Sequence, residues 1–243
     1  RSIKSLNVRH LIFRESNIIA QRQKGLKYLL FWLFYFLFYR NFDLLICQSD
    51  QMKDRLFQCF KWLNKKKIHT MLNPVDMEDI TRQTLEPATI NILFTNYMVA
   101  AGRFIPEKGF DILLNAYSKY RHSGGDLNLL ILGDGDGRND LEEIINELNI
   151  QEFVSLPGKV PNPCYFFKNA KLGVVSSIIE GFPNVLLEMM AVCPAVISTL
   201  CADGIQNLTN VKTCPVNNID ALAELLSADN DNKENYSLSY DKE

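Results

Sequence analysis

The stretch EGFPNVLLEMMAVCPAVIS, residues 180–198, decides how the larger part of this chain folds. It follows the apolar run LGVVS at 172–176, which is typical of a buried parallel strand. Gly181 and Pro183 mark a turn, and Asn184 is a good N-cap for the helix that follows. A strand, a tight turn and a helix in succession indicate one unit of a parallel α/β sheet.

The same stretch carries two carboxylates placed to face one ligand. Glu180 stands where the strand ends, and Glu188 lies one turn into the helix. The helix would direct its free backbone N–H groups and the positive end of its dipole beside Glu180, an arrangement that suits an anion such as a diphosphate. The alternative is that Glu180 only ends a turn and that Glu188 is an ordinary surface residue.

A second strand-to-helix loop supplies two cations. Residues 98–101 form a short apolar strand that leads into GRFIPEKG at 102–109. This loop places Arg103 and Lys108 where they can neutralise two phosphates. A third segment, ILGDGDG at 131–137, also runs from an apolar strand into glycines, although alone it fits a flexible acidic turn equally well.

Taken in order, GRFIPEKG, ILGDGDG and EGFPNVLLEMMA resemble the motifs of glycosyltransferase family 4, with matching order and spacing across residues 88–226. The resemblance implies the GT-B fold, which has two Rossmann-like α/β domains built on parallel sheets. It also implies a retaining enzyme that moves a hexosyl or N-acetylhexosaminyl group from a nucleotide diphosphate sugar. We expect an incomplete acceptor-side domain at 1–82 whose start lies upstream, a nucleotide-sugar-binding domain at 83–226, and a polar, disordered tail at 227–243.

The resemblance also implies a role for each matched residue. Arg103 and Lys108 would bind the donor diphosphate and stabilise the charge on the leaving group, and Glu180 would contact the donor sugar, so these three are the expected catalytic residues. Glu188 would accept hydrogen bonds from ribose hydroxyls. Two cations and a helix end would replace a metal ion, so neither a metal nor another cofactor is expected. The residues expected to bind the donor are Gly102, Gly133, Val160, Gly181, Phe182, Pro183, Asn184, Val185 and Glu188.

Two positions depart from the family pattern. Cys193 stands where the family usually has a glycine that allows close packing, and Asn207 stands where glutamate is usual. Two alternative functions therefore stay open. One is a sugar-nucleotide epimerase on the same fold, which would need further acid and base groups. The other is a non-catalytic remnant that only binds sugar nucleotides.

Charge is unevenly distributed along the chain. The formal net charge is −2, whereas residues 1–82 hold 15 Lys and Arg against 7 Asp and Glu, a net +8, and the remainder holds 11 against 21, a net −10. An anionic membrane surface is the favoured partner of the basic part, and nucleic acid is not, because no nucleic-acid-binding signature occurs. The alternative is that the basic part docks on the acidic part. Six cysteines without metal-ligand spacing indicate buried, reduced thiols.

The segment LKYLLFWLFYFLFY, residues 26–39, is unusually apolar, and its run of 12 residues from Tyr28 to Tyr39 is well short of the roughly 20 that span a bilayer as a helix. Three interpretations compete: a buried core helix, a helix lying in a membrane interface, and a spanning helix. Whichever holds, we expect a peripheral protein at the cytoplasmic face of a membrane, acting on a lipid-linked glycan or an envelope polysaccharide precursor, and the second interpretation would place this helix at that membrane. The basic residues that flank the segment are Arg22, Lys24, Lys27 and Arg40.

Strands and helices alternate regularly from residue 88 onward, as a parallel sheet requires. Because ligands bind beyond the carboxyl ends of such strands, the residues that follow the strands should line one edge. These residues are Arg103, Gly133, Val160 and Glu180. The expected helices are 110–120, 138–148, 162–169 and 219–226, and the expected strands are 127–132, 153–156 and 172–176. Earlier in the chain we expect strands at 11–13 and 43–49 and a helix capped by Ser49.

Overall fold

The computed structural model describes residues 9–15, 25–39, 42–71, 73–86, 90, 92 and 94–228. The chain divides into two compact units, residues 1–74 and 75–243. The boundary between these units lies eight residues before the expected boundary at 82/83. The reason is that the helix α3 (Met77–Leu85) packs on two helices of the second unit, α6 and α7.

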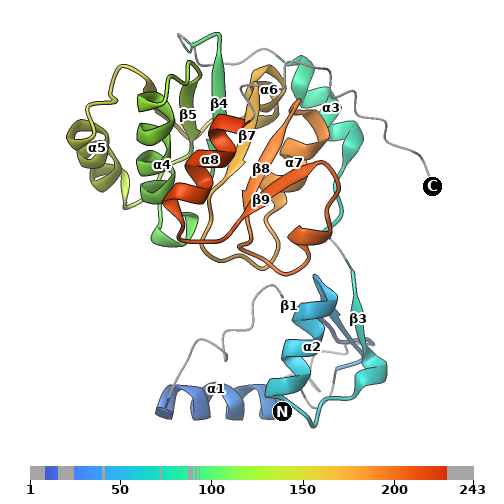
Figure 1. Ribbon diagram of the computed structural model, residues 1–243. Coiled ribbons are helices and arrows are strands. Elements are labelled where there is room, and N and C mark those ends of the chain that lie inside the picture. The colour runs from blue at the N-terminus through green and yellow to red at the C-terminus, as the bar shows by residue number, and fades with distance from the viewer. Residues whose placement is uncertain are drawn as a thin grey trace. The chain divides into compact units, whose positions relative to one another are not determined.

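The second unit is built on a sheet of six parallel strands in the order β6-β5-β4-β7-β8-β9 (Figure 1). The central strand β4 pairs with β5 on one side and with β7 on the other. This is the strand order of the dinucleotide-binding Rossmann fold, in which the order reverses beside the first strand. The strands are β4 (Tyr97–Ala101), β5 (Asn128–Leu132), β6 (Val154–Gly158), β7 (Leu172–Val175), β8 (Val196–Thr199) and β9 (Val211–Cys214).

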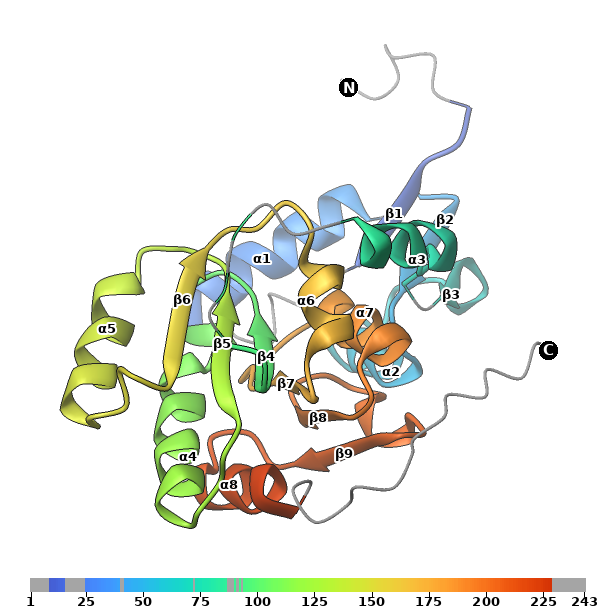
Figure 2. The ribbon, with the colours of Figure 1, turned by 90° about the horizontal axis from the view of Figure 1, so that it is seen from above.

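Helices cover both faces of this sheet, as Figure 2 shows, so its four central strands are buried on both sides, whereas the edge strands β6 and β9 are only partly buried. Successive residues of β4 point to opposite faces, so Met98 packs with α4, α5 and α8, whereas Val99 packs with α3, α6 and α7. On the second face Leu186 and Met189 of α7 are fully buried, and each such burial contributes about 1.5–3 kcal/mol. The helices not yet delimited are α4 (Phe110–His122), α5 (Arg138–Glu147), α6 (Pro163–Asn169), α7 (Asn184–Val192) and α8 (Ile219–Ala228).

Most elements of this unit lie within two residues of their expected bounds. The helix α7 differs at its start, because Pro183 occupies the cap position and Asn184 is the first helical residue. Three elements were not anticipated, namely α3, β8 and β9. A signal for α3 was present in Asp76, whose carboxylate caps the helix by accepting the N–H of Asp79 at 2.9 Å.

Cys193 fits at the end of α7 because its neighbour on β7 has no side chain. Its Sγ would lie 3.1 Å from a Cβ built at Gly173, and it donates to the carbonyl of Phe167 at 3.1 Å. The cysteine does not distort the helix end: α7 runs unbroken to Val192, and Cys193 is its C-cap residue. All six cysteines are free, five are buried, and Cys59 is half-buried.

Among its described residues, the first unit has three parallel strands in the order β1-β2-β3 and two α-helices. Ser49 caps α2 as expected, accepting the N–H of Met52 at 3.1 Å. The helix α1 turns Tyr35 inward against Phe60, with ring centroids 4.4 Å apart. The elements are β1 (Ile12–Glu15), α1 (Gly25–Phe38), β2 (Leu44–Cys47), α2 (Asp50–Cys59) and β3 (Ile68–Thr70), and short 3-10 helices occur at Lys65–Lys67, Pro106–Lys108 and Ile205–Asn207.

Of the three interpretations of the aromatic segment, the spanning helix is not supported, since no helix of the described residues is long and apolar enough to cross a membrane. The core-helix interpretation holds for one side of α1 only. Three of its flanking basic residues, Arg22, Lys24 and Arg40, lie outside the described residues, as does the tail from residue 229 onward. Ser227 and Ala228, expected in that tail, belong to α8.

Candidate functional site

Backbone hydrogen bonds join the loop after β4 to the loop after β5. The N–H of Gly102 donates to the carbonyl of Leu132 at 2.9 Å, and the N–H of Phe104 donates to Asp134 at 3.0 Å. Gly133 has φ +135°, and a Cβ built on it would lie 1.8 Å from the carbonyl oxygen of Gly102. Only glycine fits there, so Gly133 serves the site by letting these two strand ends meet.

The far end of the 102–109 loop is held against the loop that follows β7. Ser176 donates its hydroxyl to the carbonyl of Lys108 at 2.9 Å, and the N–H of Ile178 donates to Glu107 at 2.8 Å. Gly109 has φ +58°, and a Cβ there would lie 2.4 Å from the carbonyl oxygen of Ser176. These contacts fix the direction in which Lys108 leaves the backbone.

Lys108 reaches Glu180 and forms an ion pair with it. The distance from Nζ to Oε1 is 2.5 Å, and the two side chains are 18% and 20% exposed. The Lys108 stem runs beside Gly102, whose missing Cβ would meet Cδ and Cε at 3.2 Å. Ser177 donates its hydroxyl to the same Oε1 at 3.0 Å, so this carboxylate oxygen has two donors.

The backbone around Glu180 is tied to the end of β8. The N–H of Glu180 donates to the carbonyl of Cys201 at 2.8 Å, and the hydroxyl of Thr199 donates to the carbonyl of Ser177 at 2.5 Å. The three loops that follow β4, β7 and β8 are therefore joined at the carboxyl edge of the sheet. A carboxylate and an ammonium held from three loops form a preorganised site.

A cavity of about 400 Å³ opens beside this ion pair. The start of α7 forms part of its wall, so the positive end of the helix dipole lies at the cavity. The lining residues are Ala101, Gly102, Lys108, Pro163, Phe167, Glu180, Phe182, Pro183, Asn184, Val185 and Glu188.

Glu188 is the second carboxylate of this cavity and lies on the next turn of α7. Burial raises the pKa of its carboxyl group above the ordinary value. The thiol of Cys164 on α6 has its pKa raised to about 11, first by burial and then by the negative charge of Glu188. Among the described residues, no hydrogen bond or ion pair to the Glu188 carboxylate is found. Its oxygens can therefore accept hydrogen bonds from the hydroxyl groups of a ligand.

The structure brings most of the expected site residues together, including two of the three expected catalytic residues, Lys108 and Glu180. Four do not line the cavity. Arg103 is exposed on the loop beside it, Gly133 lies behind Gly102, and Val160 packs among apolar residues near α6. Gly181, the fourth, lies between Glu180 and the lining residue Phe182.

Sequence reasoning missed several residues of the site. Pro163 and Phe167 line the cavity from α6, and the hydroxyl of Ser177 donates a hydrogen bond to the carboxylate of Glu180. Pro163 had a visible signal, because Asn162 and Pro163 form a helix start with proline at its first position. Phe167 and Ser177 had no signal beyond lying in an apolar helix and after a strand.

In chemical terms the cavity offers one lysine, two carboxylates and the start of a helix. The lysine and the helix N–H groups suit an anion, and the carboxylates suit hydroxyl groups. Over the described ranges, no group of three or more histidine, cysteine, aspartate or glutamate residues is placed to hold a metal ion.

Comparison with known proteins gives consistent matches. Residues 86–236 match the family model described as "Glycosyl transferases group 1". An uncharacterised glycosyltransferase of Methanocaldococcus jannaschii is 32% identical over 218 residues, which are 88% of this chain and 53% of that protein. The N-acetylgalactosamine-N,N'-diacetylbacillosaminyl-diphospho-undecaprenol 4-alpha-N-acetylgalactosaminyltransferase of Campylobacter jejuni is 31% identical over 172 residues, 71% of this chain and 45% of that protein.

A solved structure, Anabaena HepE in complex with UDP and glucose, superposes with a TM-score of 0.73 at 19% identity, over 92% of this chain and 62% of that one. This likeness confirms an α/β fold with the Rossmann-like parallel sheets of GT-B glycosyltransferases. The chain spans about half the length of the curated relatives it matches.

Proposed function

Because this chain belongs to the glycosyl transferases group 1 family, we propose that it is a retaining glycosyltransferase of the family 4 type. It moves a hexosyl or N-acetylhexosaminyl group from a nucleotide diphosphate sugar to a lipid-linked glycan or an envelope polysaccharide precursor. The observation that carries the proposal is the Lys108–Glu180 pair at the start of α7, with Glu188 one helical turn further along the same cavity.

Each chemical group of the donor has a matching set of residues in this cavity. The diphosphate takes the end with Lys108 and the N–H groups of α7, and Arg103 approaches it from the exposed side of the same loop. Glu180 faces the donor sugar. The ribose hydroxyls donate to Glu188, whose carboxylate has no described partner and whose burial strengthens such hydrogen bonds. The backbone at Val160 contacts the base.

The reaction then depends on charge stabilisation of the leaving group. The bond between the sugar carbon and the diphosphate oxygen breaks while the acceptor hydroxyl oxygen bonds to the same carbon. The hydroxyl proton passes to the departing nucleoside diphosphate, on which negative charge grows. Lys108, Arg103 and the helix N–H groups stabilise that charge, an effect that is large in a site shielded from water. When the diphosphate binds, Lys108 exchanges its ion pair with Glu180 for one with phosphate. The Glu180 carboxylate can then accept a hydrogen bond from a hydroxyl group of the sugar.

The location follows from the acceptor. We infer that the enzyme works as a peripheral protein at the cytoplasmic face of a membrane. The Campylobacter relative is named for a diphospho-undecaprenol acceptor, which supports a lipid-linked acceptor here. The charge distribution agrees, since residues 1–74 hold 14 Lys and Arg against 4 Asp and Glu, a net +10, and residues 75–243 hold 12 against 24, a net −12.

Titration of the chain with UDP, GDP, ADP and dTDP by calorimetry tests the donor cavity, with Lys108→Ala as the control that should lose binding. A panel of labelled nucleotide sugars with lipid-linked acceptors then tests transfer, and proton NMR of the product gives its anomeric configuration. Transfer with retention supports the proposal. Interconversion of two nucleotide sugars would instead identify an epimerase, and binding without turnover would identify a non-catalytic remnant.

A further inference from the structure

The outer side of α1 is a broad apolar surface that no other described element of its unit covers. Leu26, Leu30, Leu33 and Leu37 follow one another at spacings of four, three and four residues, so they form one stripe along the helix. Leu30 is 58% exposed and Leu37 is 61% exposed. The residues of this outer face, as we call it, are Leu26, Leu29, Leu30, Leu33, Phe34, Leu37 and Phe38.

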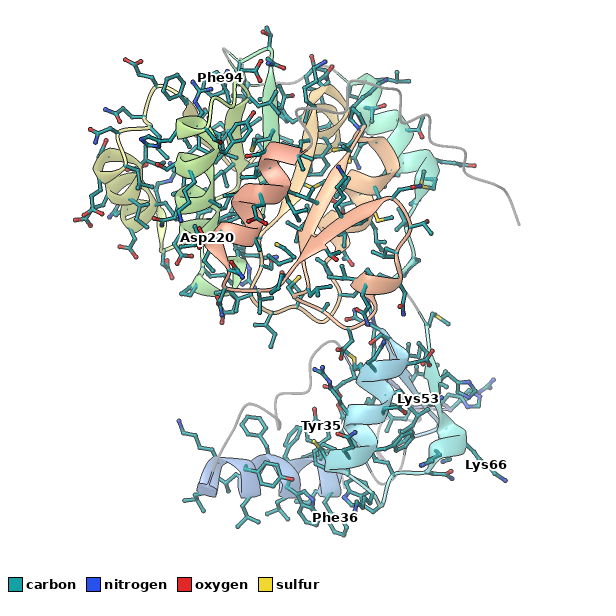
Figure 3. The ribbon with its side chains drawn as sticks, in the orientation of Figure 1. Tyr35, Phe36, Lys53, Lys66, Phe94 and Asp220 are labelled. Carbon is teal, nitrogen blue, oxygen red and sulfur yellow. The ribbon has the colours of Figure 1, made fainter. Side chains whose placement is uncertain are left out.

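The opposite side of the same helix is firmly attached to the unit. Tyr35 is buried, stacks on Phe60 and donates its hydroxyl to the buried carboxylate of Glu15 at 2.9 Å. Tyr39 donates to the other oxygen of Glu15, also at 2.9 Å. In Figure 3, Tyr35 lies between α1 and α2. The outer face is therefore presented by a helix that is anchored by its other side.

Basic residues lie near both ends of the apolar run of α1. From Tyr28 to Phe38 the helix has no charged residue, and Lys27 precedes this run. At the other end, Phe36 packs edge-on against Trp62 with ring centroids 5.4 Å apart, and Trp62 leads directly into the lysine turn Lys65–Lys67. Phe36 and Lys66 lie toward the same lower end of the unit in Figure 3.

We propose that α1 is a docking helix that lies in the surface of an anionic lipid bilayer, with the outer face inserted among the acyl chains. The lysines at both ends of the helix contact the headgroups. An apolar face bordered by lysines suits this surface, because burial of apolar side chains and attraction to anionic lipid act together. A helix of 14 residues is too short to span a bilayer, so it lies along the surface.

The inference deepens the proposed function and rests on it for the location at a membrane. Its test does not involve the donor cavity, because vesicle binding needs neither a nucleotide nor an acceptor. Failure of docking with intact sugar transfer would refute this inference alone. Docking without any sugar transfer would refute the proposed function alone.

Co-sedimentation of the whole 243-residue chain with vesicles tests the apolar contribution. The vesicles contain either phosphatidylcholine alone or phosphatidylcholine mixed with phosphatidylglycerol. We expect binding to the anionic vesicles, and a loss of about tenfold in partitioning for each serine introduced at Leu30, Leu33 or Leu37. A matched control carries serine at three exposed apolar positions outside α1 and should bind like the wild type; these positions are Met71, Leu85 and Leu200.

The charge contribution has its own pair of variants. Replacing Lys65 and Lys66 with glutamine should weaken binding to anionic vesicles several-fold and reduce its sensitivity to salt. The same change at the exposed Lys168 and Lys171 of the second unit removes equal charge and should leave binding unchanged. If both double variants lost vesicle binding equally, the chain as a whole would be attracted to anionic lipid without a specific site. That result would overturn the assignment of docking to α1.

Tryptophan fluorescence reports insertion once a tryptophan stands on the outer face, as in Phe34→Trp, because the two native tryptophans, Trp32 and Trp62, pack against the core of the unit. We expect the emission of the Phe34→Trp variant to shift to shorter wavelength on anionic vesicles and to be quenched by brominated acyl chains. Binding without quenching would overturn insertion. A dimer in solution that dissociates when Leu33 becomes serine, without vesicle binding by the wild type, would show that a second copy covers the outer face and would also overturn the proposal.

Discussion

Lys108 Nζ lies 2.5 Å from Glu180 Oε1, so the lysine of the proposed donor cavity is paired with a carboxylate of the same chain. The hydroxyl of Ser177 contacts the same oxygen at 3.0 Å and holds the carboxylate in place. An incoming diphosphate must therefore compete with Glu180 for Lys108. This competition divides the roles of the two carboxylates, because Glu188 has no such partner among the described residues.

Glu180→Gln and Glu188→Gln should consequently affect nucleoside diphosphate binding in opposite directions. The first variant removes the charge that competes for Lys108, so binding should be equal to the wild type or tighter. The second removes the acceptor for the ribose hydroxyls, and binding should weaken by about 1.5–3 kcal/mol, the value of a hydrogen bond to a charged group. Calorimetry with the free nucleoside diphosphate measures both.

Glu107→Gln is the matched control for this pair, because Glu107 carries an exposed carboxylate on the same loop as Lys108. It should bind like the wild type. Equal weakening by Glu180→Gln and Glu188→Gln would show that the sugar and ribose roles are divided wrongly.

Arg103→Ala and Lys108→Ala should each reduce kcat/KM for sugar transfer by about 2–4 kcal/mol of transition-state stabilisation, because both cations are assigned to the leaving diphosphate. Lys171→Ala, an exposed lysine just before the start of β7, is the control. Steady-state assays with the nucleotide sugar measure the effect. Activity within about threefold of the wild type in both variants would contradict the assignment to the diphosphate.

Much of the second unit could be predicted because its signals are local. An apolar run followed by glycine marks β4 and β5, and an apolar run alone marks β7. The strand-to-helix turns place Lys108 and Glu180 at one edge of a parallel sheet. Side-chain direction could not be predicted from such signals. Arg103 and Lys108 share a loop, yet only Lys108 turns into the cavity, because contacts made by Ser176 and Gly109 fix the end of the loop.

The helix α1 was ambiguous for a different reason. Its residues are apolar on every side, so the sequence has no period that distinguishes a covered face from an open one. The buried face is set by Glu15 and Phe60, which lie far from Tyr35 in the sequence. The strand β9, with the sequence VKTC, lies at the sheet edge and has too few apolar residues to stand out.

Gly133→Ala should destabilise the fold far more than Gly124→Ala. Both glycines have positive φ, which costs a residue with a Cβ roughly 1–2 kcal/mol. At Gly124 the new Cβ meets nothing within 4 Å, whereas at Gly133 it lies 1.8 Å from the carbonyl oxygen of Gly102 and must displace backbone. We expect about 3–5 kcal/mol at Gly133, measured by urea unfolding.

The comparison between the two glycines separates backbone strain from steric overlap. Similar losses of stability at both positions would mean that Gly133 and Gly102 do not meet as described. A stable Gly133→Ala variant that fails to bind a nucleoside diphosphate would instead assign Gly133 a direct role in binding.

Glu188→Gln should stabilise the ligand-free fold at neutral pH while it weakens ligand binding. Burial raises the pKa of this carboxyl group above its ordinary value of 4.5, so the folded protein holds the proton more tightly than the unfolded chain does. That contribution to stability is present below about pH 4.5 and is lost as the pH rises through the raised pKa. The free energy of unfolding in urea at pH 7 should therefore be larger for the variant than for the wild type, and the difference should shrink at lower pH. Glu143→Gln, at an exposed position, is the control and should leave the free energy of unfolding unchanged. A variant less stable than the wild type at pH 7 would mean that Glu188 has a partner in the free protein and is not held ready for ribose.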